Sequence, residues 1–132
     1  MPEPGRWLEL AHEDIEMAEF ALSQGIFRQV CFHAQQAAEK ALKGILDFRI
    51  GTHPKSHVLE QLLLFDPDLH SELQDWQARC RDLDLFYIPT RYADAPPGLL
   101  AAGEPTREQA ELALRNAREL VAVVREKIFR RL

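Results

Sequence analysis

A basic and an imidazole side chain lie close together in the run FRQVCFHAQQAAEKALKGILDF, which spans residues 27–48. Arg28 and His33 are separated there by four residues. Metal-free RNA cleavage needs a base for the ribose 2′-hydroxyl and a cation that stabilises the phosphorane, roles open to His33 and Arg28. Five helical steps turn the chain by about 140° and advance it by about 7.5 Å, so the two side chains face different sides of one helix. We therefore expect such a site only where two copies meet; the alternative is a pair of ordinary surface residues.

A second candidate site joins a predicted loop to the polar face of the 27–48 helix. Its members are side chains that could hold a nucleotide or RNA: Arg91, Tyr92, Asp94, Gln36, Lys40 and Lys43. Arginine offers a fork of donors for phosphate, tyrosine a stacking surface and lysine positive charge. Asp14 is a candidate anchor for Arg91. The alternatives are that Arg91 and Asp94 only pin the loop, and that the lysines belong to a solvated face.

No other grouping of reactive residues is complete. His53, His57 and His70 are imidazoles of the kind that zinc accepts, but the first two flank a proline turn and no carboxylate or thiol is spaced to complete a ligand shell. The chain has no glycine-rich phosphate loop and no nucleophile elbow. We therefore expect neither a metal nor a cofactor.

The first half of the chain predicts two helices that position these residues. Apolar residues recur at i, i+3, i+4 and i+7 through residues 27–48, which predicts a helix with one buried stripe. The same spacing over residues 4–23 predicts a preceding helix, ended by Gly25. Asp14 falls inside its apolar stripe, where a buried carboxylate needs a partner. The alternative is that helix rotation brings Asp14 to the rim.

The second half begins with a short and then a longer predicted helix. Ser56 is the expected N-cap of a short helix over residues 57–65. Asp66 and Pro67 then open a helix that continues to residue 87.

Residues 88–105 are rich in proline and glycine and predict a long loop. Thr106 and Gln109 form a capping box that opens a final helix reaching the C-terminus. No strand alternation or internal repeat interrupts this pattern. We therefore expect an all-α fold, an antiparallel up-and-down helical bundle of four long helices plus one short helix, as a single domain over residues 1–132.

The composition is that of an ordinary globular protein, with 46% hydrophobic and 28% charged residues. A net charge of −5 predicts no general attraction to nucleic acid, so any such binding must be local. Cys31 and Cys80 fall on apolar stripes and are expected to be reduced core residues. With no signal peptide and no run long enough to span a membrane, we expect a cytoplasmic protein.

Two aromatic residues lie outside the predicted buried stripes. Phe32 falls between Gln36 and Lys43 on the polar face of its helix, and Phe20 lies near the end of the first helix. A phenyl ring on a polar face suggests a second surface to bury against. We expect Phe32 and Phe20 to form a protein interface.

Four segments together resemble the small stand-alone HEPN proteins of bacteria and archaea. They are W..LA.EDIEMAEFAL..GIF, HAQQAAEKALKGIL, THPKSH and LDLFYIPTRYADAP, and they cover almost the whole chain. The resemblance implies an up-and-down helical bundle that commonly forms homodimers. It also implies a role beside a minimal nucleotidyltransferase in a toxin–antitoxin type pair, and nucleotide binding.

Other members of that family are metal-independent endoribonucleases with an arginine followed, after four to six residues, by a histidine. No histidine follows Arg91 at such a spacing, and only Arg28 with His33 matches the pattern. Our first hypothesis is therefore a dimeric binding protein that acts with a nucleotidyltransferase and contacts nucleotide or RNA. The second is an endoribonuclease that uses Arg28 and His33, and the third is an interaction module without a ligand.

Overall fold

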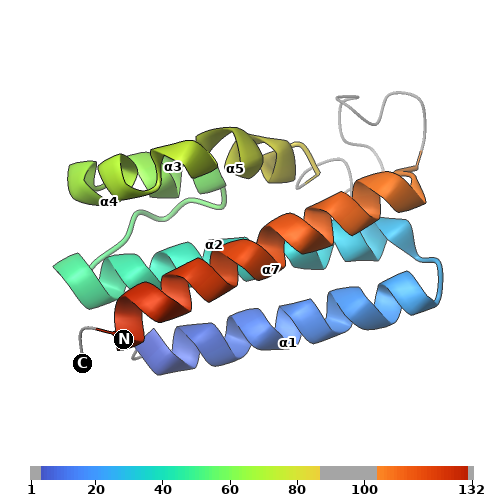
Figure 1. The fold of residues 1–132 in the computed structure, drawn as a ribbon, viewed down its shortest axis with the longest axis horizontal. Coiled ribbons are helices and arrows are strands. Elements are labelled where there is room, and N and C mark those ends of the chain that lie inside the picture. Colours follow the sequence, from blue (N-terminus) through green and yellow to red (C-terminus); the bar gives the residue numbers. More distant parts are fainter. Residues whose placement is uncertain (1–3, 87–103, 131–132) are drawn as a thin grey trace.

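The computed structural model describes residues 4–86 and 104–130, and within those ranges the ordered elements are helices, with no strand. Figure 1 shows a helical bundle. Its elements are α1 (Pro4–Ser23), α2 (Phe27–Ile50), α3 (Leu59–Leu64), α4 (Pro67–Glu72), the 3₁₀ turn η1 (Gln74–Trp76), α5 (Gln77–Asp84) and α7 (Arg107–Phe129). The predicted all-α class is confirmed.

Three long helices form the main layer of the bundle. α1 and α2 are antiparallel neighbours, and α7 packs against both and runs in the same direction as α2 (Figure 1). The segment from α4 to α5 lies over α2 and runs against it, which completes the predicted up-and-down order. None of the described helices is long and apolar enough to cross a membrane.

Small residues on α2 let its neighbours approach closely. Ala34, Ala37, Ala38 and Ala41 are fully buried, as the predicted stripe required. Gly44 continues this small surface toward α1. A Cβ atom added at Gly44 would lie 2.9 Å from Trp7 Cβ, closer than two carbon atoms pack. The contact between α1 and α2 therefore depends on a glycine at this position.

The predicted long helix over residues 67–87 is present as three shorter pieces. α4 ends at Glu72, and η1 and α5 follow without returning to one continuous α-helix. A 3₁₀ turn has three residues per turn, so it shifts the helical phase at the break. The apolar spacing of this segment predicts six inward residues. Four of them, Leu69, Leu73, Cys80 and Leu83, are buried, Trp76 is half-buried, and Tyr87 lies outside the described residues. The spacing thus located these buried side chains but did not reveal the break.

Three of the predicted helix boundaries are confirmed. Gly25 takes the left-handed conformation (φ 72°) after α1. The Asp66 side chain accepts a hydrogen bond from the Leu69 backbone N–H at the start of α4. Thr106 and Gln109 form the complete capping box of α7.

The predicted start of the short helix is wrong. α3 begins at Leu59 rather than at residue 57, and Ser56 is not its N-cap. The first two amides of α3 donate instead to the carboxylate of Asp84, at 2.8 Å from Leu59 and 3.1 Å from Glu60. A side chain 25 residues along the chain thus replaces the local cap.

Candidate functional site

The outer face of α2 carries a polar strip, which we define as His33, Gln36, Lys40, Lys43 and Asp47. These residues follow one another at steps of three and four, so they lie along one side of the helix. All five are half-buried rather than exposed. A polar surface that is partly withdrawn from water must satisfy its charges locally.

The first group on the α2 polar strip is formed with Asp14 of α1. The Asp14 carboxylate is only 7% exposed. One of its oxygens lies 2.8 Å from His33 Nδ1, and the other accepts a hydrogen bond from Lys40 Nζ. Of the two alternatives left open by the sequence, Asp14 is therefore the paired, buried carboxylate. Its partners are His33 and Lys40.

The second group surrounds Glu39, which is 4% exposed. Lys43 Nζ donates to Glu39 Oε2 over 2.9 Å, and His57 Nδ1 lies 3.1 Å from the same oxygen. The Gln36 side-chain amide donates to Gln35 Oε1 over 2.9 Å. The ammonium group of Lys43 is thus neutralised from within the fold.

The third group lies near the end of α2. The Asp47 carboxylate accepts a hydrogen bond of 2.8 Å from Trp7 Nε1, and its second oxygen lies 2.7 Å from His53 Nδ1. The Trp7 and His53 rings meet edge to face, with centroids 5.7 Å apart. The sequence predicts a proline turn at His53 and His57 without a partner for either ring, whereas in the structure each imidazole lies beside a carboxylate of α2.

Two polar residues of α2 are buried. Gln35 is fully buried and Glu39 nearly so, because α3 and α5 cover that side of α2. The Gln35 amide donates to the His57 carbonyl over 2.7 Å and to Asp84 over 3.3 Å. Burial raises the pKa of Asp84, and the bonds from the α3 amides oppose this shift. The i, i+4 spacing of Glu39 and Lys43 was the available sequence signal for part of this network.

Arg28 and His33 have different partners within one protomer. The Arg28 Nε atom donates to Glu104 over 2.9 Å, just before α7 begins. His33 instead faces Asp14 on α1. The structure therefore does not bring Arg28 and His33 together in one chain, in line with their angular separation on the helix. A pairing across two chains stays a prediction.

The predicted interface residues differ in exposure. Phe20 is 63% exposed, the highest value among the exposed large apolar side chains of the described residues. Phe32 is half-buried, and its ring meets the His33 ring edge to face at a centroid distance of 5.1 Å. The predicted loop residues Arg91, Tyr92 and Asp94 lie outside the described residues.

The three imidazoles of this region share one arrangement. His33, His53 and His57 each direct Nδ1 to a buried carboxylate of Asp14, Asp47 or Glu39. A carboxylate beside Nδ1 favours the imidazole tautomer that carries the ring proton on Nδ1. The lone pair of that tautomer is on Nε2. No group of three or more metal-ligating side chains occurs in the described ranges. The α2 polar strip, together with His53 and His57 beside it, therefore presents imidazole rings and lysine N–H donors.

Comparison with known proteins identifies the family. The HEPN domain family matches residues 5–127. The chain belongs to the HEPN family. Solved structures of similar architecture agree: TT1696 from Thermus thermophilus is 38% identical, with a TM-score of 0.82, 96% of this chain covered and 99% of that one. ST0689, an archaeal HEPN homologue, is 31% identical, with a TM-score of 0.76 and coverages of 97% and 99%. No curated protein matches this HEPN chain.

Proposed function

We propose that this HEPN protein is a homodimeric, cytoplasmic binding protein that acts with a minimal nucleotidyltransferase. Its protein interface is the α1–α2 face, which we define by Phe20 of α1 and Phe32 of α2. The α2 polar strip, with the predicted loop at Arg91, Tyr92 and Asp94, contacts nucleotide or RNA. Membership of the HEPN family supports the partner, because the resemblance to the small stand-alone members implies a toxin–antitoxin type pair.

The observation that carries the proposal is the composition of the α1–α2 face. Met17 and Phe20 follow Asp14 at steps of three along α1, and both are more than half exposed. Met17 and Phe20 therefore form an exposed apolar surface next to the contact between α1 and α2. Exposed aromatic residues beside a polar strip are typical of protein interfaces.

The charges of the same face support contact between two copies. α1 exposes the carboxylate of Glu13, whereas α2 offers Lys40 and Lys43. A two-fold axis would bring the Glu13 carboxylate of one copy to the edge of the strip of the other, and the rest of the strip would stay open to a ligand. Each lysine already has one carboxylate partner but retains further N–H donors for a second.

The same geometry favours a binding role over a catalytic role for this protein. Arg28 is occupied by Glu104, so the proposed cation of a ribonuclease site lies away from His33. One observation favours the second candidate, a metal-independent endoribonuclease. Asp14 holds His33 in the orientation of a general base, with Lys40 on the same carboxylate as a nearby cation.

The test combines association and RNA chemistry on the full chain. We expect Phe20→Asp and Phe32→Asp to shift the protein from dimer to monomer in size-exclusion chromatography with light scattering. Leu112→Asp, at an exposed apolar position of α7, is the matched control and should leave the dimer intact. A wild-type monomer, or variants that remain dimeric, would remove this interface from the proposal.

For ligand binding we would titrate a labelled mixed single-stranded RNA, and separately ATP, in EDTA. Lys40→Ala and Arg91→Ala should weaken binding by about tenfold, as expected where a charged contact of about 1.4 kcal/mol is lost. Arg115→Ala is the control, because Arg115 lies on the exposed side of α7. Cleavage of the RNA that disappears in His33→Ala would favour the endoribonuclease, and unchanged affinities would exclude the strip as the binding site.

A further inference from the structure

A hollow of about 240 Å³ lies between the end of α5 and the first half of α7, and we call it the α5–α7 hollow. Its walls are mainly apolar and include Leu83, Phe86, Leu112 and Ala113. Leu83 and Ala113 are buried, whereas Leu112 is 46% exposed. Pockets for drug-sized ligands usually measure about 300–1,000 Å³, so this hollow suits a smaller molecule.

One polar side chain of the α5–α7 hollow is held in a single orientation. Asn116 of α7 lines the hollow and is only 4% exposed. Its side-chain oxygen accepts a hydrogen bond of 2.8 Å from Arg79 Nε. Arg79 is itself fixed, because its guanidinium carbon lies 3.8 Å from the centre of the Trp76 ring and its Nη2 pairs with Glu119. The Asn116 oxygen therefore faces Arg79, and the amide nitrogen points the other way.

The amide nitrogen of Asn116 is a donor without a partner. No residue in the described part of the chain accepts a hydrogen bond from it. It is not sealed inside the protein, since the fully buried side-chain polar atom that lacks a partner in the described ranges is Arg49 Nε. The nitrogen is thus accessible, although the rest of Asn116 is buried. It can donate to an acceptor that enters the hollow.

Gln109 repeats this arrangement seven residues earlier on α7. Its side-chain oxygen accepts a hydrogen bond of 2.8 Å from the Thr106 backbone N–H, which leaves its amide nitrogen as a donor. Seven residues advance a helix by about 10 Å and return to nearly the same face, so Gln109 and Asn116 lie along one wall. The α5 wall supplies an acceptor, the exposed carboxylate of Asp82, which pairs with no cation among the described residues.

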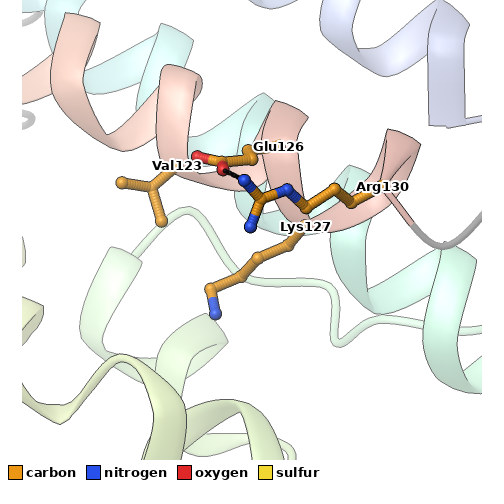
Figure 2. A pocket seen from close by; sticks show the side chains of 4 residues that line it. All are labelled: Val123, Glu126, Lys127 and Arg130. Atoms are coloured by element: carbon orange, nitrogen blue, oxygen red, sulfur yellow. Dashed lines mark ion pairs between the residues drawn. The ribbon is translucent and has the colours of Figure 1, made fainter.

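The hollow near the end of α7 differs in this respect (Figure 2). It measures about 490 Å³ and is lined by Val123, Glu126, Lys127 and Arg130. Arg130 pairs with Glu126, and Lys127 pairs with Glu72. Its cations therefore already have partners within the fold. The α5–α7 hollow instead combines apolar walls with fixed N–H donors that have no acceptor in the described ranges.

We propose that the α5–α7 hollow binds a small apolar molecule that carries a neutral amide group. The ligand's carbonyl oxygen accepts a hydrogen bond from Asn116, and its N–H donates to Asp82. Its apolar body lies against Leu83 and Ala113. A carboxylate ligand is disfavoured, because it has no proton to donate to Asp82 and carries the same charge. This site is separate from the α2 polar strip and does not depend on the function proposed above.

Asn116 is the only asparagine of the chain, which permits a direct measurement. Full-length protein labelled with ¹⁵N at asparagine gives one side-chain NH₂ group in the ¹H–¹⁵N spectrum. Titration with 3-phenylpropanamide should shift this signal saturably. 3-Phenylpropionate has the same apolar body and should bind about fivefold more weakly. Asp82→Asn should reduce that difference.

Asn116→Asp removes the N–H donor but keeps an oxygen for Arg79, so the fold should be retained. We expect the dissociation constant of 3-phenylpropanamide, measured from the backbone amide signal of Leu83, to rise about tenfold in this variant. Gln29→Glu makes the same amide-to-carboxylate change at an exposed position of α2. It is the matched control and should leave the dissociation constant unchanged. Circular dichroism melts check that each variant folds.

A saturable shift of the Asn116 signal, with weaker binding in Asn116→Asp and unchanged binding in Gln29→Glu, would support the site. Three results would each overturn it: no saturable shift in the wild type, equal affinity in Asn116→Asp, or 3-phenylpropionate binding as tightly as the amide. A preference for the amide that Asp82→Asn leaves unaltered would overturn the role of Asp82.

Discussion

The imidazole of His33 on α2 and the carboxylate of Asp14 on α1 lie 2.8 Å apart at the seam between the two helices. Lys40 binds the other oxygen of the same carboxylate. One buried acid thus satisfies two half-buried groups of the α2 polar strip and ties the strip to α1.

Replacing Asp14 tests this link. Asp14→Ala leaves His33 and Lys40 without their acceptor, and we expect a loss of about 1–3 kcal/mol in the free energy of unfolding. Urea denaturation followed by circular dichroism measures the loss. Glu13→Ala, at the exposed neighbouring position, should change stability by less than about 0.5 kcal/mol. Equal effects of the two substitutions would contradict the pairing.

The remote cap of α3 gives a second prediction. Asp84→Ala removes the acceptor for the amides of Leu59 and Glu60, and capping losses are typically about 0.5–2 kcal/mol. Hydrogen exchange should quicken at these two amides of α3 before it changes in α2. Asp84→Asn keeps one acceptor oxygen and should lie between wild type and Asp84→Ala. Unaltered exchange in Asp84→Ala would show that the cap is unimportant.

A third prediction concerns the close contact between Gly44 and Trp7. Gly44→Ala should destabilise the protein by about 1–3 kcal/mol, because the added methyl group forces α1 away from α2. Thermal unfolding and Trp7 fluorescence report the change. Gly5→Ala is the matched control, since a Cβ atom there meets nothing within 4 Å. A Gly44→Ala protein as stable as wild type would indicate that the helices are not so close.

Glu72 predicts a dependence of stability on acid pH. Hydrogen bonds from Arg49 are the main cause that lowers the pKa of Glu72 from 4.5 to about 2. A carboxyl group with a lower pKa in the folded state stabilises the fold above pH 4.5, and this contribution is lost as pH falls from 4.5 toward 2. Because Glu72 is partly exposed, solvent screening limits the effect to about 1 kcal/mol.

The check for Glu72 is urea unfolding of wild type and Glu72→Gln at pH 6 and pH 3. The stability difference between the two proteins should shrink at pH 3. A difference that stays constant or grows would contradict the assigned ion pairs.

The two cysteines should be chemically inert in the folded protein. Burial raises the pKa of both Cys31 and Cys80 to about 12, so almost no thiolate forms near pH 8. Ellman's reagent should react slowly with the native chain and rapidly with two thiols after addition of guanidinium chloride. Rapid reaction of either thiol without denaturant would show that its site opens readily.

Local patterns in the sequence determined most of the helical architecture. The i, i+3, i+4 spacing located α1 and the start of α2, and Gly25, Asp66 and Thr106 marked boundaries that the structure confirms. These signals act over a few residues, because backbone conformation and capping depend on near neighbours. The break at η1 escaped prediction because the apolar spacing there remained compatible with one continuous helix.

The candidate site depended on contacts between distant segments. The sequence by itself placed Gln36, Lys40 and Lys43 on one face of α2 and singled out Asp14. Only the tertiary structure decided that Asp14 binds His33 and Lys40, that α3 and α5 bury Glu39, and that Asp84 caps α3. Helical periodicity fixes the direction of a side chain, but the partner it meets depends on how separate helices pack. That packing is set by the whole core, so no single stretch of this sequence could specify it.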